Sequence, residues 1–174
     1  ARRSAGAAAH LLPRGVCPGA LPMSYRSPSV RWSLLPIRLV VGFGFLSHGL
    51  AKFGRGPQKF GQLLDLIGAP FPVPTAWMVT TLEIVGGIAL LCGAFVVIAS
   101  VPLAISMLVA IATIHWRYGF SAVNTIGLSP TGPIFGPPGY EVPLLYIAAL
   151  LALSLSDPSA LSVDGWLRRR TRTT

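Results

Sequence analysis

Charged residues are scarce in this chain. They make up 11% of its 174 residues, whereas a soluble domain carries about a quarter. Acidic residues are scarcest, with five against fourteen Lys and Arg, and none precedes Asp65. Hydrophobic residues reach 52%, in long unbroken runs, and the mean hydropathy is +0.65. This composition excludes an ordinary soluble domain and predicts an integral membrane protein in a lipid bilayer.

Cysteines and common cofactor motifs are also lacking. The two cysteines, Cys17 in the N-terminal tail and Cys92 in an apolar segment, do not indicate a disulfide. There is no glycine fingerprint for a flavin or dinucleotide, no cysteine cluster for an iron–sulfur centre, and no predicted metal site. Any redox chemistry would therefore take its electrons from a partner or from a bound cofactor.

The net charge of +9 does not indicate nucleic-acid binding. Ten of the fourteen basic residues flank the first and last apolar segments, namely Arg2, Arg3, Arg14, Arg26, Arg31, Arg38, Arg168, Arg169, Arg170 and Arg172. Flanks of this kind mark the cytoplasmic ends of membrane helices. We therefore predict a multi-pass plasma-membrane protein with an even number of crossings and both termini in the cytoplasm.

Four apolar segments predict four membrane-spanning helices. The first covers about 34–53 and the last about 141–156. The run from Trp77 to Trp116 is about twice the roughly 20 residues of one crossing, so it must contain two helices, with a turn near Gly93. Pro102 would then lie in about the first turn of the third helix, where proline is tolerated. The predicted fold is an all-α, four-helix membrane bundle.

The two longer connections carry different patterns. In the connection 54–75, apolar residues recur at the spacing of an amphipathic helix, which predicts a short interfacial helix between helices 1 and 2. These residues are Phe60, Leu63, Leu64 and Ile67. The Gly- and Pro-rich connection 117–140 predicts a long irregular loop, which is either a binding element or a slack connector.

One membrane domain, 31–167, is predicted between two basic tails. Residues 1–30 are expected to be disordered. Their first 22 residues either precede a true start at Met23 or resemble an organellar transit peptide, which is also rich in Arg and poor in acidic residues. Residues 168–174 form the basic C-terminal tail.

Five ionisable side chains within or beside the apolar segments carry the functional prediction. Taking the helical rise of about 1.5 Å per residue, all five fall in the outer half of the bundle, on four different helices. They are His48, Lys52, Glu83, His115 and Glu141. Such groups usually face a bundle interior, a water-filled cavity or a ligand. We predict a polar pocket in which His48 and Lys52, four residues apart on one helix face, meet Glu83.

Several of these residues also have plainer interpretations. Either histidine could be a hydrogen-bonded packing residue, the lysine could extend to the interface, and Glu141 could simply favour a helix N-terminus. For Glu83 a functional or buried-pairing role is favoured, because its neighbours are apolar. Gly86 and Gly87, one turn away on the same helix face, leave room for a close helix contact or a ligand. Aromatic residues mark the outer helix ends. Four residues near this level are predicted to surround a cofactor: His115, Glu141, Trp77 and Trp116.

Five segments, in this order, resemble the DoxX family of small four-helix bacterial membrane proteins. They are "IRLVVGFGFLSHGLAKF", "TLEIVGGIALLCG", "MLVAIATIH", "GYEVPLLYIAALLALSL" and "SALSVDGW". The resemblance covers about residues 34–166 and implies a four-helix bundle. It also implies a role in quinone- or thiol-linked redox chemistry, because the founding members are subunits of a thiosulfate:quinone oxidoreductase. The turn after Gly93, "AFVV", departs from the polar turn usual in the family.

The leading functional prediction is therefore a membrane subunit that serves a partner redox enzyme. A quinone head group would enter between the helices, with Glu83, His48 and Lys52 as the catalytic residues. The histidine and lysine would donate hydrogen bonds to the quinone oxygens, and the glutamate would pass protons. The alternatives are a non-catalytic anchor or assembly subunit, a haem b protein ligated by His48 and His115, and a small-molecule permease.

Overall fold

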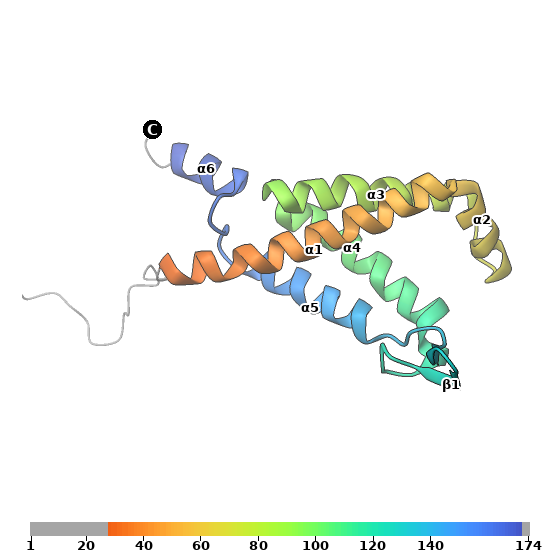
Figure 1. The fold of residues 1–174 in the computed structure, drawn as a ribbon. Coiled ribbons are helices and arrows are strands. Elements are labelled where there is room, and N and C mark those ends of the chain that lie inside the picture. Colours follow the sequence, from red (N-terminus) through yellow and green to blue (C-terminus); the bar gives the residue numbers. More distant parts are fainter. Residues whose placement is uncertain (1–27, 172–174) are drawn as a thin grey trace, which may run out of the picture.

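The computed structural model describes residues 28–171, and it is mainly helical (Figure 1). The helices are α1 (Pro28–Arg55), α2 (Pro57–Leu66), α3 (Pro72–Cys92), α4 (Val96–Ala110), α5 (Glu141–Leu155) and α6 (Val163–Arg170). A π-helical turn, η1 (Ile111–His115), and a 3₁₀ turn, η2 (Trp116–Tyr118), extend α4. Of the N-terminal tail expected to be disordered, residues 1–27 lie outside the described residues, and residues 28–30 begin α1.

Three helical stretches are long and apolar enough to cross a membrane: Trp32–Arg55, Pro72–Cys92 and Val96–Tyr118. The fourth apolar helix, α5, has 15 residues. At 1.5 Å per residue it is about 22 Å long, which is less than the roughly 30 Å of a bilayer's hydrocarbon core. The protein thus has the apolar helices that the sequence predicts, and the fourth crossing stays a prediction.

Glycines bring α1 and α3 together more closely than any other pair of helices. A Cβ atom at Gly87 of α3 would lie 2.6 Å from the backbone nitrogen of Leu46 in α1, and one at Gly42 would lie 3.0 Å from the backbone nitrogen of Leu91. Only glycine leaves room for backbones at this separation. These contacts fix α1 and α3 as the tightest helix pair in the described chain.

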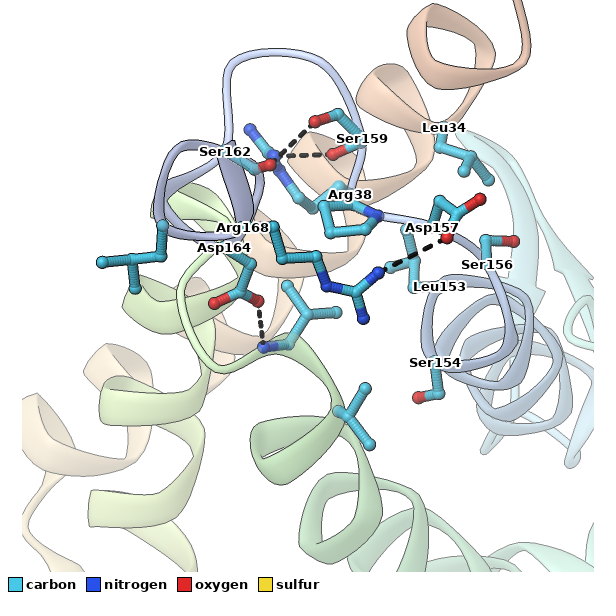
Figure 2. A pocket seen from close by; sticks show the side chains of 14 residues that line it. Leu34, Arg38, Leu153, Ser154, Ser156, Asp157, Ser159, Ser162, Asp164 and Arg168 are labelled. Atoms are coloured by element: carbon cyan, nitrogen blue, oxygen red, sulfur yellow. Dashed lines mark hydrogen bonds and ion pairs between the residues drawn. The ribbon is translucent and has the colours of Figure 1, made fainter. Parts of the chain in front are cut away.

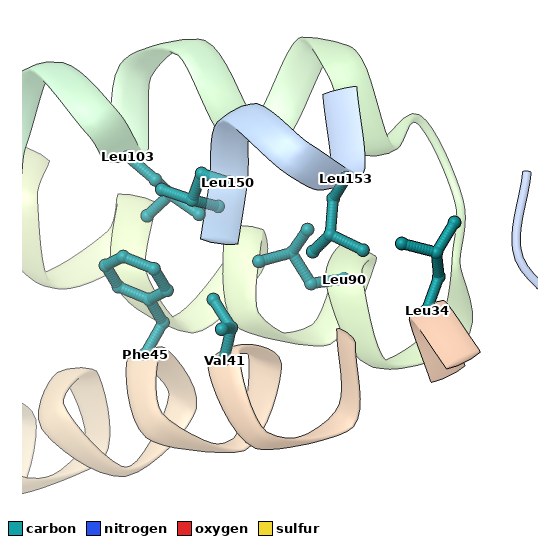
Figure 3. Packing of buried hydrophobic residues seen from close by; sticks show 7 residues of the cluster. All are labelled: Leu34, Val41, Phe45, Leu90, Leu103, Leu150 and Leu153. Atoms are coloured by element: carbon teal, nitrogen blue, oxygen red, sulfur yellow. The ribbon is translucent and has the colours of Figure 1, made fainter. Parts of the chain in front are cut away.

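A cluster of buried apolar side chains joins α1, α3, α4 and α5 (Figure 3). Its members are Leu34, Val41, Phe45, Leu90, Leu103, Leu150 and Leu153. From residue 104 to residue 118, by contrast, no residue of α4, η1 or η2 is buried. The four helices therefore pack together near α6, whereas towards α2 the helices α4 and α5 diverge from α1 and α3, as Figure 1 shows. We call these two regions the α6 end and the α2 end.

The turn between the second and third predicted helices lies where the sequence places it. Gly93 ends α3 with a left-handed backbone (φ 64°), and its N–H and that of Ala94 donate to carbonyls of the last helical turn. This is the usual glycine ending of a helix. One detail was wrong: α4 begins only at Val96, and Pro102 lies in its second turn instead of its first.

The connection between α1 and α3 contains the predicted short helix. In α2 the buried residues are Pro57, Gly61 and Leu64, and α2 packs against α3. A Cβ at Gly61 would lie 3.2 Å from the Val73 side chain at the start of α3. Of the four apolar residues that predicted this helix, only Leu64 is buried, and Leu63 is 44% exposed. The location of α2 at a membrane surface stays a prediction.

The connection 117–140 is more regular than predicted. It contains an antiparallel hairpin, β1 (Thr125–Ser129) and β2 (Gly132–Phe135), in which Leu128 pairs with Pro133. The expectation of an irregular loop was therefore wrong here. The four residues Ser129 to Gly132 read Ser-Pro-Thr-Gly, and Ser, Pro and Gly at the first, second and fourth positions are typical of a type I turn.

Candidate functional site

The predicted contact between Lys52 and Glu83 is present. Lys52 Nζ, in the last turn of α1, donates to Glu83 Oε2 of α3 at 2.5 Å. The Glu83 side chain is 3% exposed and that of Lys52 is 24% exposed. A Cβ at Gly49 would lie 3.1 Å from the Glu83 Cβ, so the close approach of α1 and α3 brings the pair together. The result is an ion pair with one buried and one partly accessible member.

The α2 helix lies beside this pair. Lys52 Nζ is 5.3 Å from the ring centroid of Phe60 in α2, within the range of a cation–π contact. Leu64, one turn later, is buried. Three elements, α1, α2 and α3, therefore surround the lysine, and the remaining N–H groups of its ammonium can reach another acceptor.

Two other predicted site residues lie on the same helices but are more exposed. His48 is exposed on α1, one turn before Lys52. Trp77, 41% exposed on α3, meets the Phe53 ring of α1 edge-on at a centroid distance of 6.2 Å. An ionisable group facing outward from a membrane-spanning helix is costly in lipid. In a bilayer, such a position favours a polar neighbour for His48, such as head groups, a ligand or a partner chain.

The remaining predicted residues gather at the hairpin instead of beside the ion pair. The His115 ring Nδ1 lies 2.9 Å from the carbonyl oxygen of Pro138, and Glu141 Oε2 accepts the Ala122 N–H at 2.8 Å. Trp116 stacks on Tyr140 at 5.4 Å. These contacts fasten the connection 119–140 to the ends of α4 and α5.

The structure therefore divides the predicted polar group into two. Lys52 and Glu83 meet between α1 and α3, whereas His115 and Glu141 hold the hairpin, which lies apart from α2 in Figure 1. The depth of each residue along its helix, counted from the sequence, correctly placed Lys52 and Glu83 at the same level. Depth alone does not show that α4 and α5 diverge from α1 and α3. The sequence therefore predicted one pocket, whereas the structure has two separate contacts.

Arg38 is the functional candidate that the sequence analysis left out. It is 2% exposed, in α1 at the α6 end, and lines a cavity of about 290 Å³ between α1, α4, α5 and α6 (Figure 2). Its Nη1 donates to Ser159 Oγ at 2.6 Å and its Nη2 to the carbonyl oxygen of Leu161 at 3.0 Å. The available signal was that Arg38 lies a few residues inside the first apolar segment, where an arginine rarely lacks a specific partner.

Comparison with known proteins decides the family. A family model for DoxX matches residues 33–116. The chain is also 32% identical over 145 residues to an uncharacterized membrane protein of Mycobacterium tuberculosis, an alignment that covers 79% of this chain and 83% of the relative. The chain belongs to the DoxX family. A second relative of this DoxX protein, an uncharacterized protein of Haemophilus influenzae, is 26% identical over 141 residues, covering 79% of this chain and 84% of that one. No solved structure matches significantly.

The DoxX match covers the whole Lys52–Glu83 contact but only the arginine side of the Arg38 contacts with Ser159, Ala160 and Leu161. Residues 33–116 contain Arg38 and the Lys52–Glu83 pair, together with α2, α3 and α4. The hairpin and Glu141 lie beyond the match. In this membrane protein the ion pair is therefore part of the segment shared with the family model, and it is the candidate site from which we argue function.

Proposed function

We propose that this DoxX protein is the membrane subunit of a quinone- or thiol-linked redox system, and that the Lys52–Glu83 pair with His48 holds a quinone head group. The observation that carries the proposal is the partly open ion pair: Glu83 is buried at 3% exposure while Lys52 keeps 24%. Because Lys52 is partly exposed, its ammonium can donate to a ligand as well as to the buried Glu83 carboxylate.

The residues present fit the polar atoms of a quinone. Lys52 has three N–H donors, of which Glu83 accepts one. His48 lies one helical turn away and offers a further ring N–H. A quinone, when bound, supplies two-electron redox chemistry, and its reduction to a quinol also consumes two protons. In the proposal Lys52 and His48 orient the carbonyl oxygens, a partner enzyme delivers two electrons, and two protons pass from water by way of Lys52 and its partner Glu83 to the quinone oxygens.

The proposal includes a topology. The domain 31–167 crosses the plasma membrane four times, with α5 as the fourth crossing, and the basic segments at both ends of the chain lie in the cytoplasm. The α6 end then faces the cytoplasm and the α2 end faces outward, with α2 at the outer surface. Support comes from the apolar helices and from the arginines in the last turn of α6, Arg168, Arg169 and Arg170.

The other predicted residues take supporting roles in this proposal. Trp77, with Phe53, forms an aromatic edge near the ligand. His115, Trp116 and Glu141 hold the hairpin through the contacts described above, so the proposal does not require them to touch a cofactor. A bis-histidine haem site receives no support from this geometry, because His48 faces outward from α1 while His115 contacts Pro138.

A second function, the non-catalytic anchor or assembly subunit, is favoured by a different observation. The hairpin exposes large apolar side chains, namely Ile126, Leu128, Ile134 and Phe135. The connection 118–140 contains no charged residue. A small uncharged surface of this kind is suited to docking a partner subunit. In that case the Lys52–Glu83 pair would be structural and the protein would bind no quinone.

A binding measurement distinguishes the two functions. Purified protein in detergent is titrated with decylubiquinone, and quenching of its tryptophan fluorescence is followed. The redox proposal expects saturable binding that weakens about tenfold in His48→Leu, since a hydrogen bond to a charged or polarised group is lost. Ser47→Leu, at the neighbouring exposed position, is the matched control and should bind normally. Absence of saturable binding in the wild type, or unchanged binding in His48→Leu, would favour the anchor function over the redox function.

A further inference from the structure

The cavity at the α6 end has no part in the proposed redox site. It has a volume of about 290 Å³ and lies near the beginnings of α1 and α4 and the end of α5, with residues of α6 on one side (Figure 2). Its walls combine two kinds of side chain. The polar ones include Arg38, Arg168, Ser154 and several further hydroxyl and carboxyl groups, and the apolar ones are Leu34, Val96, Val97, Leu153 and Leu167.

Arg38 is buried without an ion pair among the described residues, although the cavity that it lines also holds two carboxylates. Its terminal nitrogens donate only to uncharged oxygens: Ser159 Oγ and the carbonyls of Leu91, Ala160 and Leu161. Its Nε–H is buried and has no acceptor. Among the described residues no carboxylate forms an ion pair with Arg38. A buried cation usually has a charged partner, and one carboxylate of this cavity, Asp164, acts on the Arg38 charge without forming an ion pair.

The two acidic residues of the cavity are engaged elsewhere. The Asp164 carboxylate accepts the N–H groups of Phe95 and Val96, at 2.9 and 3.0 Å, and so caps the first turn of α4. Asp157 contacts Arg168 at 3.4 Å, and both side chains are more than half exposed. An exposed pair of that kind contributes little to stability. Arg168 can therefore turn to an incoming anion at small cost.

The apolar walls indicate what kind of anion fits. Val97 of α4 and Leu153 of α5 add apolar surface to the walls of the cavity, beside the polar groups. Trp166 of α6 lies nearby in sequence with Arg170 stacked 3.9 Å from its ring centroid, an arrangement common at membrane–water interfaces. A small soluble anion would use only the polar part, whereas a lipid would also cover the apolar part.

We propose that this cavity binds an anionic phospholipid, with the phosphate between Arg168 and Arg38 and one acyl chain along Val97 and Leu153. Basic pockets between membrane helices on the cytoplasmic side are suited to such head groups. The lipid would link α4, α5 and α6 at the end where the four helices pack together. It would thus stabilise the bundle independently of any ligand at Lys52 and Glu83.

The test uses the full-length protein purified in a mild detergent. Its thermal unfolding is measured with added dioleoylphosphatidylglycerol, dioleoylphosphatidylcholine or inorganic phosphate, and native mass spectrometry measures how many lipid molecules stay bound. Only phosphatidylglycerol should raise the unfolding temperature, with one molecule retained. In Arg168→Gln the affinity should fall about fivefold, the effect of one arginine near an anionic lipid. Arg170→Gln, on the same helix but outside the cavity, should bind like the wild type.

A second variant tests the apolar part of the cavity. Ser154→Phe adds a ring at the wall formed by α5, so it should abolish retention of the lipid while leaving unfolding without lipid unchanged. Equal stabilisation by inorganic phosphate would identify a site for a free anion and overturn the lipid proposal. Equal stabilisation by phosphatidylcholine, no stabilisation by any of the three, or normal lipid affinity in Arg168→Gln would also overturn it.

Discussion

At the scale of single residues, the partner of Glu83 follows from its surroundings. An acidic side chain near the middle of a membrane helix costs roughly 2.5–3.5 kcal/mol, so it needs a cation, and Lys52 lies at its depth. The sequence could not separate Lys52 from His48 in the same way. His48 precedes Gly49 directly and so lies about 100° around the helix from it. Since Gly49 marks the face of α1 that touches α3, His48 is turned away from the contact.

Arg38 illustrates what the sequence could not supply. In the sequence it resembles one more basic residue at the beginning of an apolar segment. The groups that bury it, Ser159, Ala160 and Leu161, lie more than 120 residues later in the chain. These residues reach α1 only because the segment after α5 turns back towards it in the folded chain. The residues around Arg38 in the sequence carry no information on such a distant contact.

Glu141 provides a prediction at this scale. In Glu141→Ala the Ala122 N–H loses its acceptor, and the net loss of one such hydrogen bond is about 1 kcal/mol. We expect the Ala122 amide to exchange with deuterium about fivefold faster in detergent-solubilised protein. Glu141→Gln keeps an acceptor oxygen and should preserve most of the protection. Equal exchange in the wild type and the alanine variant would mean that this bond does not hold the hairpin.

At the scale of helices and strands, the sequence predicted the helices well because hydrophobic runs and glycine endings are local signals. The turn at Gly93 and the amphipathic α2 are both present in the structure. The sequence analysis did not predict the hairpin, because its strands of five and four residues are too short to show an alternating pattern. The Ser-Pro-Thr-Gly sequence of its turn was the one available signal. The divergence of α4 from α3 was also missed, since it depends on side-chain volume between helices.

The packing of α1 against α3 can be tested at Gly87. In Gly87→Ala the new methyl group would lie 2.6 Å from a backbone nitrogen of α1, so the two helices must separate. Overpacking of this kind costs about 1–3 kcal/mol, and we expect a lower unfolding temperature in detergent. Gly54→Ala, near the end of α1, is the matched control, because a Cβ there meets nothing within 4 Å. A Gly87→Ala protein as stable as the control would contradict the close helix contact.

The α2 helix yields a second prediction at this scale. Leu64 is buried against the protein, whereas Leu66 is 84% exposed on the same helix. Leu64→Asp should detach α2 from α3 and expose Lys52, while membrane insertion stays normal. Leu66→Asp should leave α2 in place. Limited proteolysis of residues 57–66 in membranes reports the difference; equal cleavage of both variants would show that α2 does not cover the ion pair.

At the scale of the whole molecule, the α6 end and the α2 end have different characters. The α6 end combines the apolar core, the buried Arg38 and a basic helix, whereas the α2 end has diverging helices and the Lys52–Glu83 pair. In the proposed topology the redox site and the lipid site lie on opposite sides of the bilayer. The two proposals can therefore fail independently.

The topology makes a prediction of its own. Pro28→Cys and Arg170→Cys, each introduced into a chain whose native cysteines are replaced by serine, should both be protected from an impermeant thiol reagent in intact cells. Both should react after the membrane is opened, because four crossings place both ends in the cytoplasm. Labelling of one position alone in intact cells would require an odd number of crossings and would remove α5 as the fourth.

The central claim is that the Lys52–Glu83 pair acts on a ligand and is more than a structural contact. Buried ion pairs that are only structural can often be replaced by apolar residues of similar volume. The most direct measurement is therefore the rate of quinone-linked electron transfer in membranes containing Glu83→Gln or the double variant Lys52→Met with Glu83→Leu, with assembly checked on native gels. The account predicts that both variants assemble normally and that electron transfer falls about a hundredfold, the contribution of one proton-transfer group. An assembled and fully active Glu83→Gln protein would contradict it.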